Sequence, residues 1–372
     1  MKIVRVEPIA VRLPMMRPMK MAGVEIRSAD NLLVRVDADN GLTGWGEAAS
    51  APTMTGEFVE GMVAAVRYLV PSLEGARFAA PETVSAQLAR SLPGNTSVKA
   101  AIDMALYDLL GKARQQPVYA LLGGALRQRI PALWMLGTGS ADSDVAEAKA
   151  KVAQGFVAFK IKVGVGHPLA DAERTRRICS AIGTGHLISA DANQGWSVEQ
   201  ALAYLDAIND APLDFLEQPI SAGDLAGLAR IAAATRVAIG VDESIHEIAD
   251  IARHHESGAA KGCSLKAIKM GGLRIVHQAA QQCQASGMKV NLACKVAESS
   301  IATAAVLHLA ASIPSIDWGV SLSSQYLADD IVKTPLAIAH GHATVPAGHG
   351  LGIEVDEAKV DRYRYGAGDW LR

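Results

Sequence analysis

Three carboxylates and three lysines stand at regular intervals in the middle of the chain, in a pattern that could bind a metal and move protons. Each carboxylate ends a short β-rich run, and successive ones are about 25 residues apart, one strand–helix unit each: Asp191, Glu217 and Asp242. The lysines stand in the runs before and after them: Lys160, Lys162 and Lys266. If the runs are consecutive strands of a parallel barrel, their carboxyl ends converge near the barrel axis, where such enzymes place their active sites.

The three carboxylates predict a metal site. Three like charges brought to one point repel one another unless a cation joins them. Ligand sets made only of oxygen suit Mg²⁺, which keeps part of its shell for water or substrate. We therefore expect Mg²⁺, with Mn²⁺ as an alternative, at Asp191, Glu217 and Asp242.

The lysines predict proton transfer beside that metal. Lys160 and Lys162 are two residues apart, so their side chains point to the same face of one strand. Lys266 is expected on the opposite side of the metal. A neighbouring cation and desolvation both lower the pKa of a lysine, as a general base near neutral pH requires. Together these groups suit removal of a proton α to a carboxylate and stabilisation of the resulting enediolate.

The spacing alone leaves other interpretations open. A carboxylate after a strand can be the N-cap of the next helix, although this would have to hold for three in succession. A lysine such as Lys266 can form a Schiff base in an aldolase-type barrel, a chemistry that needs no metal. The acidic strand ends favour metal-assisted proton transfer over both.

The chain from residue 126 to 335 has the alternation expected of a barrel. Short β-rich runs alternate with Ala- and Leu-rich helical stretches, which predicts βαβ units and a parallel sheet. Eight such runs fit a closed barrel better than a doubly wound sheet, since no G-x-G-x-x-G follows the first run. The eight runs are 130–136, 157–163, 187–191, 213–217, 237–242, 263–268, 288–293 and 315–318.

The flanking segments predict a second, smaller domain. Residues 1–125 begin with alternating strands joined at Asn40-Gly41, a strong hairpin signal. Helical periodicity follows from Glu57 to Leu122, so this part is typical of an α+β domain. Residues 336–372 return to alternation and are expected to rejoin that domain.

Composition bounds the surroundings and partners of the protein. With 50% hydrophobic residues and a net charge of −2, the chain lacks the basic signal of a nucleic-acid binder. The most apolar window, 301–313, falls short of the roughly 18 apolar residues that a membrane span needs. Four cysteines without C-x-x-C spacing favour a reducing cytoplasm. We expect a cytoplasmic homo-oligomer that binds a small carboxylate, and neither nucleic acid nor membrane.

Several short motifs, taken together, resemble one known family. They are Gly41-Leu-Thr-Gly-Trp-Gly-Glu47, Ala100-Ala-Ile-Asp-Met-Ala-Leu-Tyr-Asp108, Lys160-Ile-Lys162, Asp191-Ala-Asn193, Glu217-Gln-Pro219, Asp242-Glu-Ser244 and Leu265-Lys266-Ala-Ile-Lys-Met-Gly-Gly272. This combination resembles the enolase superfamily, and within it the muconate lactonizing enzyme subgroup of the mandelate racemase/muconate lactonizing enzyme family. The resemblance extends from residue 1 to about residue 357.

The resemblance implies a fold and a set of roles. The fold class is α/β: a modified TIM barrel, (β/α)7β, with an α+β amino-terminal capping domain. The roles are Mg²⁺ binding by the three carboxylates, acid and base work by Lys162 and Lys266, and contact between Lys160 and the substrate carboxylate. The mandelate racemase branch would require a His where Ala293-Cys-Lys-Val stands, so the resemblance is to the other branch.

Expected substrate contacts also follow from the resemblance, because this subgroup recognises substrates with two cap loops and the last strand. The first cap loop, about 13–28, is Met-rich, and the second is 50–56. Muconate enzymes carry Glu where Ser321 stands, whereas Asp317 with Ser321 is similar to N-acylamino acid racemases and succinylbenzoate synthases. The expected contacts are Lys160, Met16, Met19, Met54, Glu298, Asp317 and Ser321.

The predicted function is that of a Mg²⁺-dependent isomerase that abstracts the α-proton of a carboxylate through an enediolate. It would be muconate cycloisomerase-like, or a racemase or epimerase of an amino-acid derivative. An acid dehydratase, a lyase that uses the same metal and lysines, is the alternative. A non-catalytic binding barrel is a third hypothesis, which retention of all the carboxylates and lysines disfavours.

Overall fold

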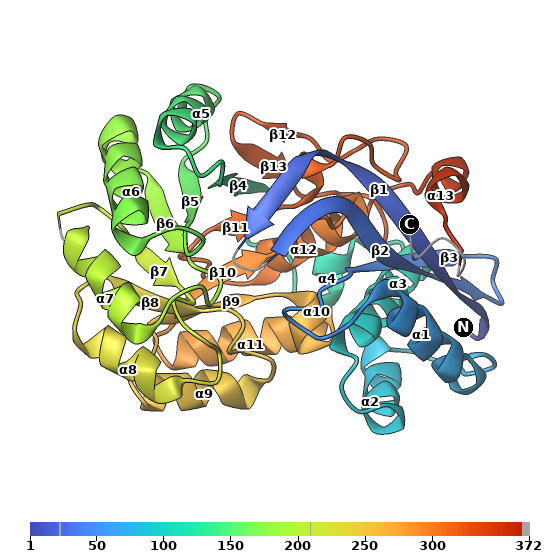
Figure 1. The fold of residues 1–372 in the computed structure, drawn as a ribbon. Helices are drawn as coiled ribbons and strands as arrows, with labels where there is room; N and C mark the ends of the chain where they lie inside the picture. Colours follow the sequence, from blue (N-terminus) through green and yellow to red (C-terminus); the bar gives the residue numbers. More distant parts are fainter. Residues whose placement is uncertain (22–23, 209, 367–372) are drawn as a thin grey trace.

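A computed structural model of the chain describes residues 1–21, 24–208 and 210–366. It divides them between an antiparallel sheet covered by helices and a closed parallel barrel (Figure 1). These are the two parts that the sequence pattern predicts.

The cap begins with a three-stranded antiparallel sheet in the order β1 (Ile3–Met21), β2 (Val24–Ala38) and β3 (Thr43–Ala49). The predicted hairpin turn between β2 and β3 is confirmed. Helix α3 can pack directly on β3 because Gly46 has no side chain. A Cβ at this position would lie only 1.9 Å from the carbonyl oxygen of Ala101. The cap helices are α1 (Val59–Leu73), α2 (Pro81–Ser91), α3 (Thr96–Ala113) and α4 (Val118–Leu121).

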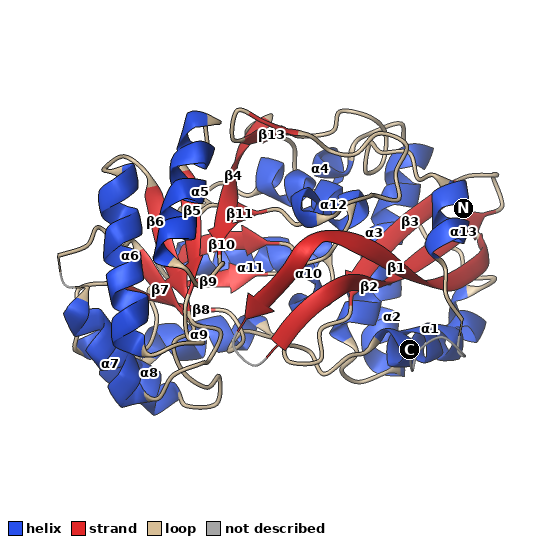
Figure 2. Ribbon diagram, turned by 45° about the horizontal axis from the view of Figure 1, so that its top comes forward, coloured by secondary structure: helices blue, strands red, loops and turns tan. Residues whose placement is uncertain are grey.

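The barrel consists of eight parallel strands, and pairing of the last strand with the first closes it. A helix follows each of the first seven strands, so the predicted (β/α)7β architecture is confirmed. Figure 2 shows helices ringing the strands. The strands are β4 (Arg129–Leu136), β5 (Ala158–Lys162), β6 (Leu187–Asp191), β7 (Phe215–Glu217), β8 (Ala238–Val241), β9 (Gly262–Leu265), β10 (Lys289–Ala293) and β11 (Val320–Ser321). The helices are α5 (Ala141–Ala153), α6 (Pro168–Ile182), α7 (Val198–Ala207), α8 (Leu225–Ala233), α9 (Ile248–Glu256), the short α10 (Ala267–Met270), α11 (Leu273–Ala285) and α12 (Ser300–Ser312).

The eighth strand lies later in the chain than the sequence pattern predicts. The expected run, 315–318, precedes β11, and Trp318 instead stacks flat on Phe215 with ring centroids 4.0 Å apart. Gly319 then turns the chain with a φ of +81°, a conformation that glycine adopts without strain. The β-forming aromatic residue therefore packs inside the barrel, and the strand begins only after it.

The carboxyl-terminal segment contacts both parts of the molecule. Strand β13 (His342–Thr344) pairs antiparallel with the start of β4, and β12 (Ile338–Ala339) pairs with β13. The two-residue β11 pairs only with Ala132 and Leu133 of β4, which leaves the start of β4 open to β13. Helix α13 (Glu357–Tyr363) packs against β1 of the cap. A short 3₁₀ turn, η1 (Ser324–Tyr326), follows β11.

Two buried carboxylates of the cap hold barrel helices at their amino-terminal ends. Glu47 of β3 accepts hydrogen bonds from the Ser299 backbone N–H (2.9 Å), the Ser299 hydroxyl (2.7 Å) and the Ala302 N–H (3.1 Å) at the start of α12. Asp103 of α3 accepts the Leu273 N–H at the start of α11, at 2.7 Å. The first N–H groups of a helix have no partner within the helix and attract negative charge. These contacts fix the position of the cap relative to the barrel.

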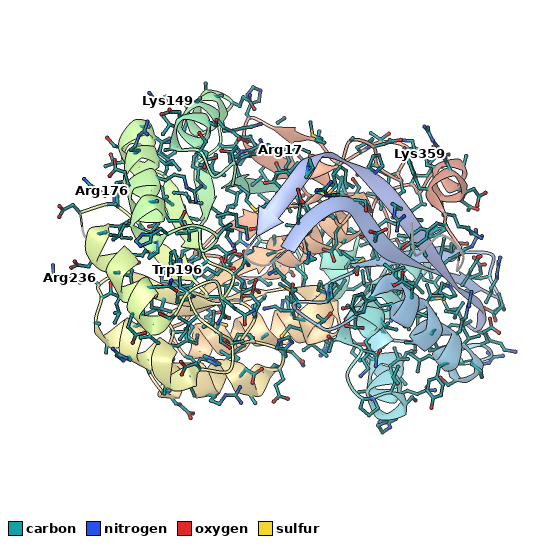
Figure 3. All side chains as sticks on the ribbon, in the orientation of Figure 1. Arg17, Lys149, Arg176, Trp196, Arg236 and Lys359 are labelled. Atoms are coloured by element: carbon teal, nitrogen blue, oxygen red, sulfur yellow. The ribbon has the colours of Figure 1, made fainter. Side chains whose placement is uncertain are left out.

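The ribbon formed by β1 and β2 reaches from the cap toward the barrel. Met15 forms a β-bridge with Leu327. Arg17, which Figure 3 labels on the ribbon, pairs with Glu147 of α5 (Nη2–Oε1 2.8 Å). The segment expected to be a Met-rich loop is therefore largely strand. Successive side chains of a strand face opposite ways, and Met16 is 69% exposed. Among the described residues, none of the helices has the length and apolar character needed to cross a bilayer.

Candidate active site

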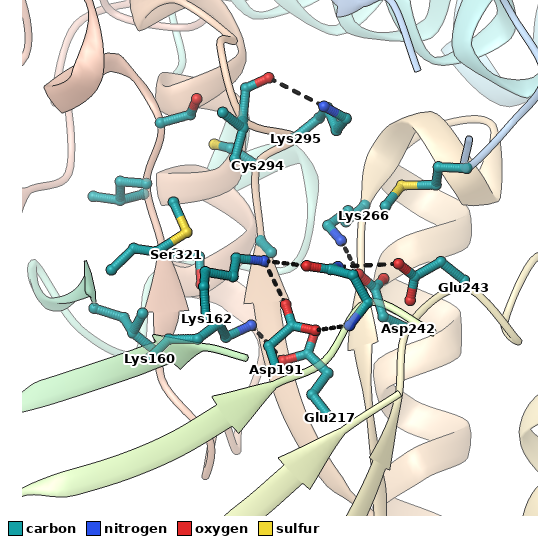
Figure 4. A pocket seen from close by; sticks show the side chains of 18 of the residues that line it. Lys160, Lys162, Asp191, Glu217, Asp242, Glu243, Lys266, Cys294, Lys295 and Ser321 are labelled. Atoms are coloured by element: carbon teal, nitrogen blue, oxygen red, sulfur yellow. Dashed lines mark hydrogen bonds and ion pairs between the residues drawn. The ribbon is translucent and has the colours of Figure 1, made fainter. Parts of the chain in front are cut away.

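The three predicted carboxylates meet at the carboxyl ends of adjacent barrel strands (Figure 4). Asp191 ends β6 and Glu217 ends β7, and the two are direct partners in the sheet register. Asp242 follows β8. All three side chains are buried, so the barrel holds three acidic groups at neighbouring strand ends.

Each carboxylate is paired with a lysine from a strand end of the same barrel. The Lys162 ammonium lies 2.6 Å from Asp191 Oδ2, Lys160 pairs with Glu217, and Lys266 pairs with Asp242. In addition, Lys269 of α10 lies 2.6 Å from Asp242 Oδ1. The cations that offset the repulsion between the carboxylates in this arrangement are therefore ammonium groups.

The pKa values of the carboxylates reflect burial against these lysines. Burial opposes ionisation of Asp191, but Lys162 and Lys160 outweigh it and lower the pKa. The pKa of Asp242 is lowered in the same way, with Lys266 and Lys269 outweighing burial. Burial raises the pKa of Glu217. Lys160 only partly offsets this effect, and the neighbouring carboxylates raise the pKa further.

Lys266 differs from the expected general base in one respect. Burial opposes its charge, but Asp242 and Glu217 outweigh burial and raise its pKa. The expected lowering is thus absent while Lys266 is paired with Asp242. In this arrangement Lys266 carries a proton and can donate it.

The donor set suits a hard divalent cation. Oxygen-only carboxylate ligands are those that Mg²⁺ prefers, and three of them project from consecutive strand ends. As they stand, no three His, Cys, Asp or Glu side chains in the described ranges converge closely enough to enclose a metal. Each of the three carboxylates is instead paired with a lysine ammonium.

Polar side chains beside the strand ends hold this geometry. Asn193 accepts a hydrogen bond from Lys162 (2.8 Å) and donates one to Glu243 (3.1 Å). The Gln218 side chain accepts the Asp242 N–H at 3.0 Å. Asn193 and Gln218 both have positive φ, at 43° and 35°, a region that costs free energy for residues other than glycine. The sharp turns after β6 and β7 direct the functional groups into the barrel mouth.

A cavity of about 250 Å³ lies above these groups, between the barrel mouth and the cap. Its floor carries the carboxylates and lysines, and its walls combine apolar and polar side chains. The pKa of Glu243 at its edge is raised to about 7 by burial and by Asp242 and Asp191. The lining residues are Thr53, Met54, Leu133, Met135, Lys160, Lys162, Asp191, Asn193, Gln194, Glu217, Asp242, Glu243, Lys266, Ala293, Cys294, Lys295, Val296, Ser321, Leu322, Ser323 and Tyr326.

The structure brings some of the expected substrate contacts to this cavity. Lys160, Met54 and Ser321 line it, whereas Met16 and Met19 of the ribbon do not. Glu298 lies behind the wall, where it accepts the Lys295 N–H at 2.9 Å.

Asp317 lies away from the cavity, at the other end of the barrel. Its carboxylate is 3.2 Å from the Lys289 ammonium at the start of β10. The reason is the late start of β11, which leaves Asp317 before the strand.

Several site residues were not assigned a role by the sequence pattern. Lys269 follows Lys266 by three residues on a short helix, a spacing that a helical pattern could have indicated. Lys295, Met135 and Tyr326 have no such signal: Lys295 lies two residues after β10, Met135 lies within β4, and Tyr326 lies in the 3₁₀ turn after β11.

Comparisons with known proteins give matches over nearly the whole chain. Residues 4–123 match the family model described as mandelate racemase/muconate lactonizing enzyme, N-terminal domain, and residues 143–359 match the one described as enolase C-terminal domain-like. A chloromuconate cycloisomerase from Cupriavidus necator is 32% identical, covering 98% of this chain and 99% of its own. An L-Ala-D/L-Glu epimerase from Bacillus subtilis is 30% identical, covering 95% and 97%. The crystal structure of a muconate lactonizing enzyme from Pseudomonas fluorescens with muconolactone superposes with a TM-score of 0.94 at 30% identity, covering 98% of this chain and 99% of that one.

Proposed function

Since this chain belongs to the mandelate racemase/muconate lactonizing enzyme family of the enolase superfamily and is an isomerase, we propose that its reaction proceeds by α-proton transfer on a carboxylate substrate. The observation that carries the proposal is the placement of Lys162 on β5 and Lys266 after β9, with the three carboxylates on the strands between them. A planar enediolate held over those carboxylates would present one face to each lysine.

Asp191, Glu217 and Asp242 would hold Mg²⁺ or Mn²⁺. When bound, the metal would supply Lewis-acid stabilisation of the negative charge that develops on the substrate carboxylate. The support for this assignment is the oxygen-only donor set on three adjacent strand ends.

The chain's own residues would then divide the remaining work. Lys160 would bind and orient the substrate carboxylate, because its ammonium lines the cavity beside the acidic strand ends. One of Lys162 and Lys266 would take the α-proton, and the other would return a proton to the opposite face. Met54 and the apolar wall would exclude water from the enediolate.

Two outcomes of this chemistry have separate support. Two lysines on opposite sides favour racemisation or epimerisation, in which each acts on one stereoisomer. The chloromuconate cycloisomerase similar over 98% of this chain favours cycloisomerisation, in which one lysine moves the proton and the other contributes charge. The epimerase from Bacillus subtilis is consistent with the first.

The experiment that tests the proposal is α-proton exchange in D₂O. The protein is incubated with Mg²⁺ and a panel of carboxylic acids, including N-acylated amino acids, dipeptides and muconates, and deuterium at the α-carbon is followed by NMR. We expect exchange with at least one compound class, abolished by chelator and restored by Mg²⁺. Exchange that persists in excess chelator would contradict the metal assignment, and its absence with every member would contradict the proposal.

A further inference from the structure

The backbone of Lys162 has a charged partner that lies outside the sheet. Lys162 is the last residue of β5, and its carbonyl accepts a hydrogen bond from the Arg174 guanidinium of α6. Arg174 is only 5% exposed, and the proposed reaction gives it no role. Burying a charged group costs free energy unless its partners are well placed. A buried guanidinium at the end of the strand that carries Lys162 therefore needs an explanation.

Two buried carboxylates extend this contact into a network. Arg174 Nη1 lies 2.6 Å from Asp144 Oδ2 of α5, and Nη2 lies 3.0 Å from Asp171 Oδ1 of α6. Asp144 also accepts the Thr138 N–H in the turn after β4, at 3.0 Å. Asp171 also accepts the Gly164 N–H in the turn after β5, at 2.9 Å. Helices α5 and α6 lie side by side (Figure 1), so the network joins both helices to the turns that precede them.

The end of β5 lies between two hollows. Lys162 lines the cavity above the carboxylates, and it also lines a second hollow of about 420 Å³ beside the turns after β4 and β5. Arg174 and Asp171 line that second hollow as well. Close packing is what normally fixes the position of a buried group. Because Lys162 borders open space on two sides, its position depends more strongly on directed hydrogen bonds such as the one from Arg174.

The backbone of Lys266 is held in a different way. Its carbonyl accepts the backbone N–H groups of Lys269 and Met270 in α10, both at 3.2 Å. Lys266 follows β9, which is four strands further round the barrel than β5. A change at Arg174 therefore removes a contact of Lys162 and leaves these contacts of Lys266 in place.

We infer that Arg174 is a positioning residue for Lys162, which fixes the direction from which the Lys162 side chain enters the active site. The inference rests on the proposed function, in which Lys162 transfers a proton at one face of the substrate. Proton transfer needs donor and acceptor within about 2.6–3.2 Å, and a displacement of about 1 Å can slow a reaction about 10²-fold. Arginine suits this task because its rigid fork of donors holds several acceptors in fixed directions.

The test variant is Arg174→Lys, which keeps a positive charge beside Asp144 and Asp171 but loses the fork of donors. The matched control is Arg177→Lys, one turn further along α6, where the arginine is exposed and pairs with Asp142 of α5. Both arginines join the same two helices, but only Arg174 contacts the backbone of β5. If Arg174→Lys does not fold, Asp171→Asn serves in its place, because it keeps the side-chain size and removes the charge that holds the guanidinium.

The first measurement needs no substrate. The folded proteins are acetylated briefly with acetic anhydride, and mass spectrometry of the peptides gives the modification of Lys162 relative to that of Lys266. We expect this ratio to rise about fivefold or more in Arg174→Lys, as the loss of one hydrogen bond gives, and to stay within about twofold in Arg177→Lys. A general loosening of the fold would raise the modification of both lysines together. A ratio that does not rise in the folded variant would overturn the inference.

The second measurement is α-proton exchange in D₂O with Mg²⁺, which separates this inference from the proposed function. Arg174→Lys should slow about tenfold or more the exchange that Lys162→Ala abolishes, and leave within about twofold the exchange that Lys266→Ala abolishes. Equal slowing of both would indicate a merely structural role and overturn the inference. A raised labelling ratio, with no exchange by the wild type on any carboxylic acid of the panel, would support the positioning of Lys162 by Arg174 and contradict the proposed reaction.

Discussion

Replacement of Glu47 by Ala should destabilise the protein strongly, although this residue lies in the cap and outside the cavity. Its carboxylate accepts the Ser299 N–H, the Ser299 hydroxyl and the Ala302 N–H at the start of α12. It also accepts a hydrogen bond from Asn31 at 2.7 Å, but that amide keeps a second partner, the Ala297 carbonyl. The substitution therefore leaves three buried donors without an acceptor.

The magnitude follows from the cost of such donors. Each buried donor left unpaired costs about 1–3 kcal/mol, so we expect a loss of at least about 3 kcal/mol in the free energy of unfolding. Part of the cost of burying the carboxylate is removed with it, which favours the lower end of that range. The loss is large compared with a typical stability of about 5–15 kcal/mol.

Urea denaturation followed by circular dichroism measures this loss. The matched control is Glu25→Ala on the same sheet, where the carboxylate pairs with the exposed Arg27 and a change below about 1 kcal/mol is expected. A Glu47→Ala protein within about 1 kcal/mol of the wild type would refute the reasoning that this carboxylate joins the cap to the barrel.

Three further predictions concern the metal, the ribbon and pH. Asp242→Asn should weaken Mg²⁺ binding in calorimetry and abolish turnover while leaving the circular dichroism spectrum unchanged; undiminished Mg²⁺ affinity would exclude it as a ligand. Arg17→Ala should break the exposed pair with Glu147, cost less than about 1 kcal/mol of stability and raise the rate of proteolysis within the ribbon, and an unchanged cleavage rate would show that the pair does not hold it. Because burial raises the pKa of Glu298 from 4.5 to about 8, the folded state binds this proton more tightly than the unfolded state, so stability falls as pH rises between those values. Glu298→Gln should reduce that fall when melting temperatures at pH 6 and pH 9 are compared, and an identical pH profile would contradict the assignment.

The site's acidic and basic core could be predicted from the sequence because barrel periodicity places successive strand ends together. The spacing of Asp191, Glu217 and Asp242 therefore predicted that they stand at neighbouring strand ends. The hairpin at Asn40-Gly41 could also be predicted, because the conformation of its turn depends on local residue types. The ion pairs within the site were harder to predict from the sequence. The pairing of Lys266 with Asp242, for example, depends on side-chain conformations that the spacing does not specify.

The cavity walls were harder to predict. Strand β11 has two residues and follows an aromatic residue that packs inside the barrel, so no periodic pattern marks it. That shift explains why Asp317 lies at the opposite end of the barrel from the cavity, whereas Ser321 lines it. Likewise, Met16 was expected at the substrate, but its segment forms a strand, and alternation turns this side chain outward.

The account depends most directly on the two lysines, and one measurement tests both. On a confirmed substrate, α-proton exchange in D₂O is followed by NMR for each enantiomer separately, with the wild type, Lys162→Ala and Lys266→Ala. For a racemase or epimerase, each variant should still exchange the α-proton of one enantiomer, opposite in the two proteins, while interconversion falls about 10²–10⁴-fold in both. For a cycloisomerase, one variant should lose activity by that factor and the other by far less. Near wild-type rates in both variants would contradict the assignment of the active site.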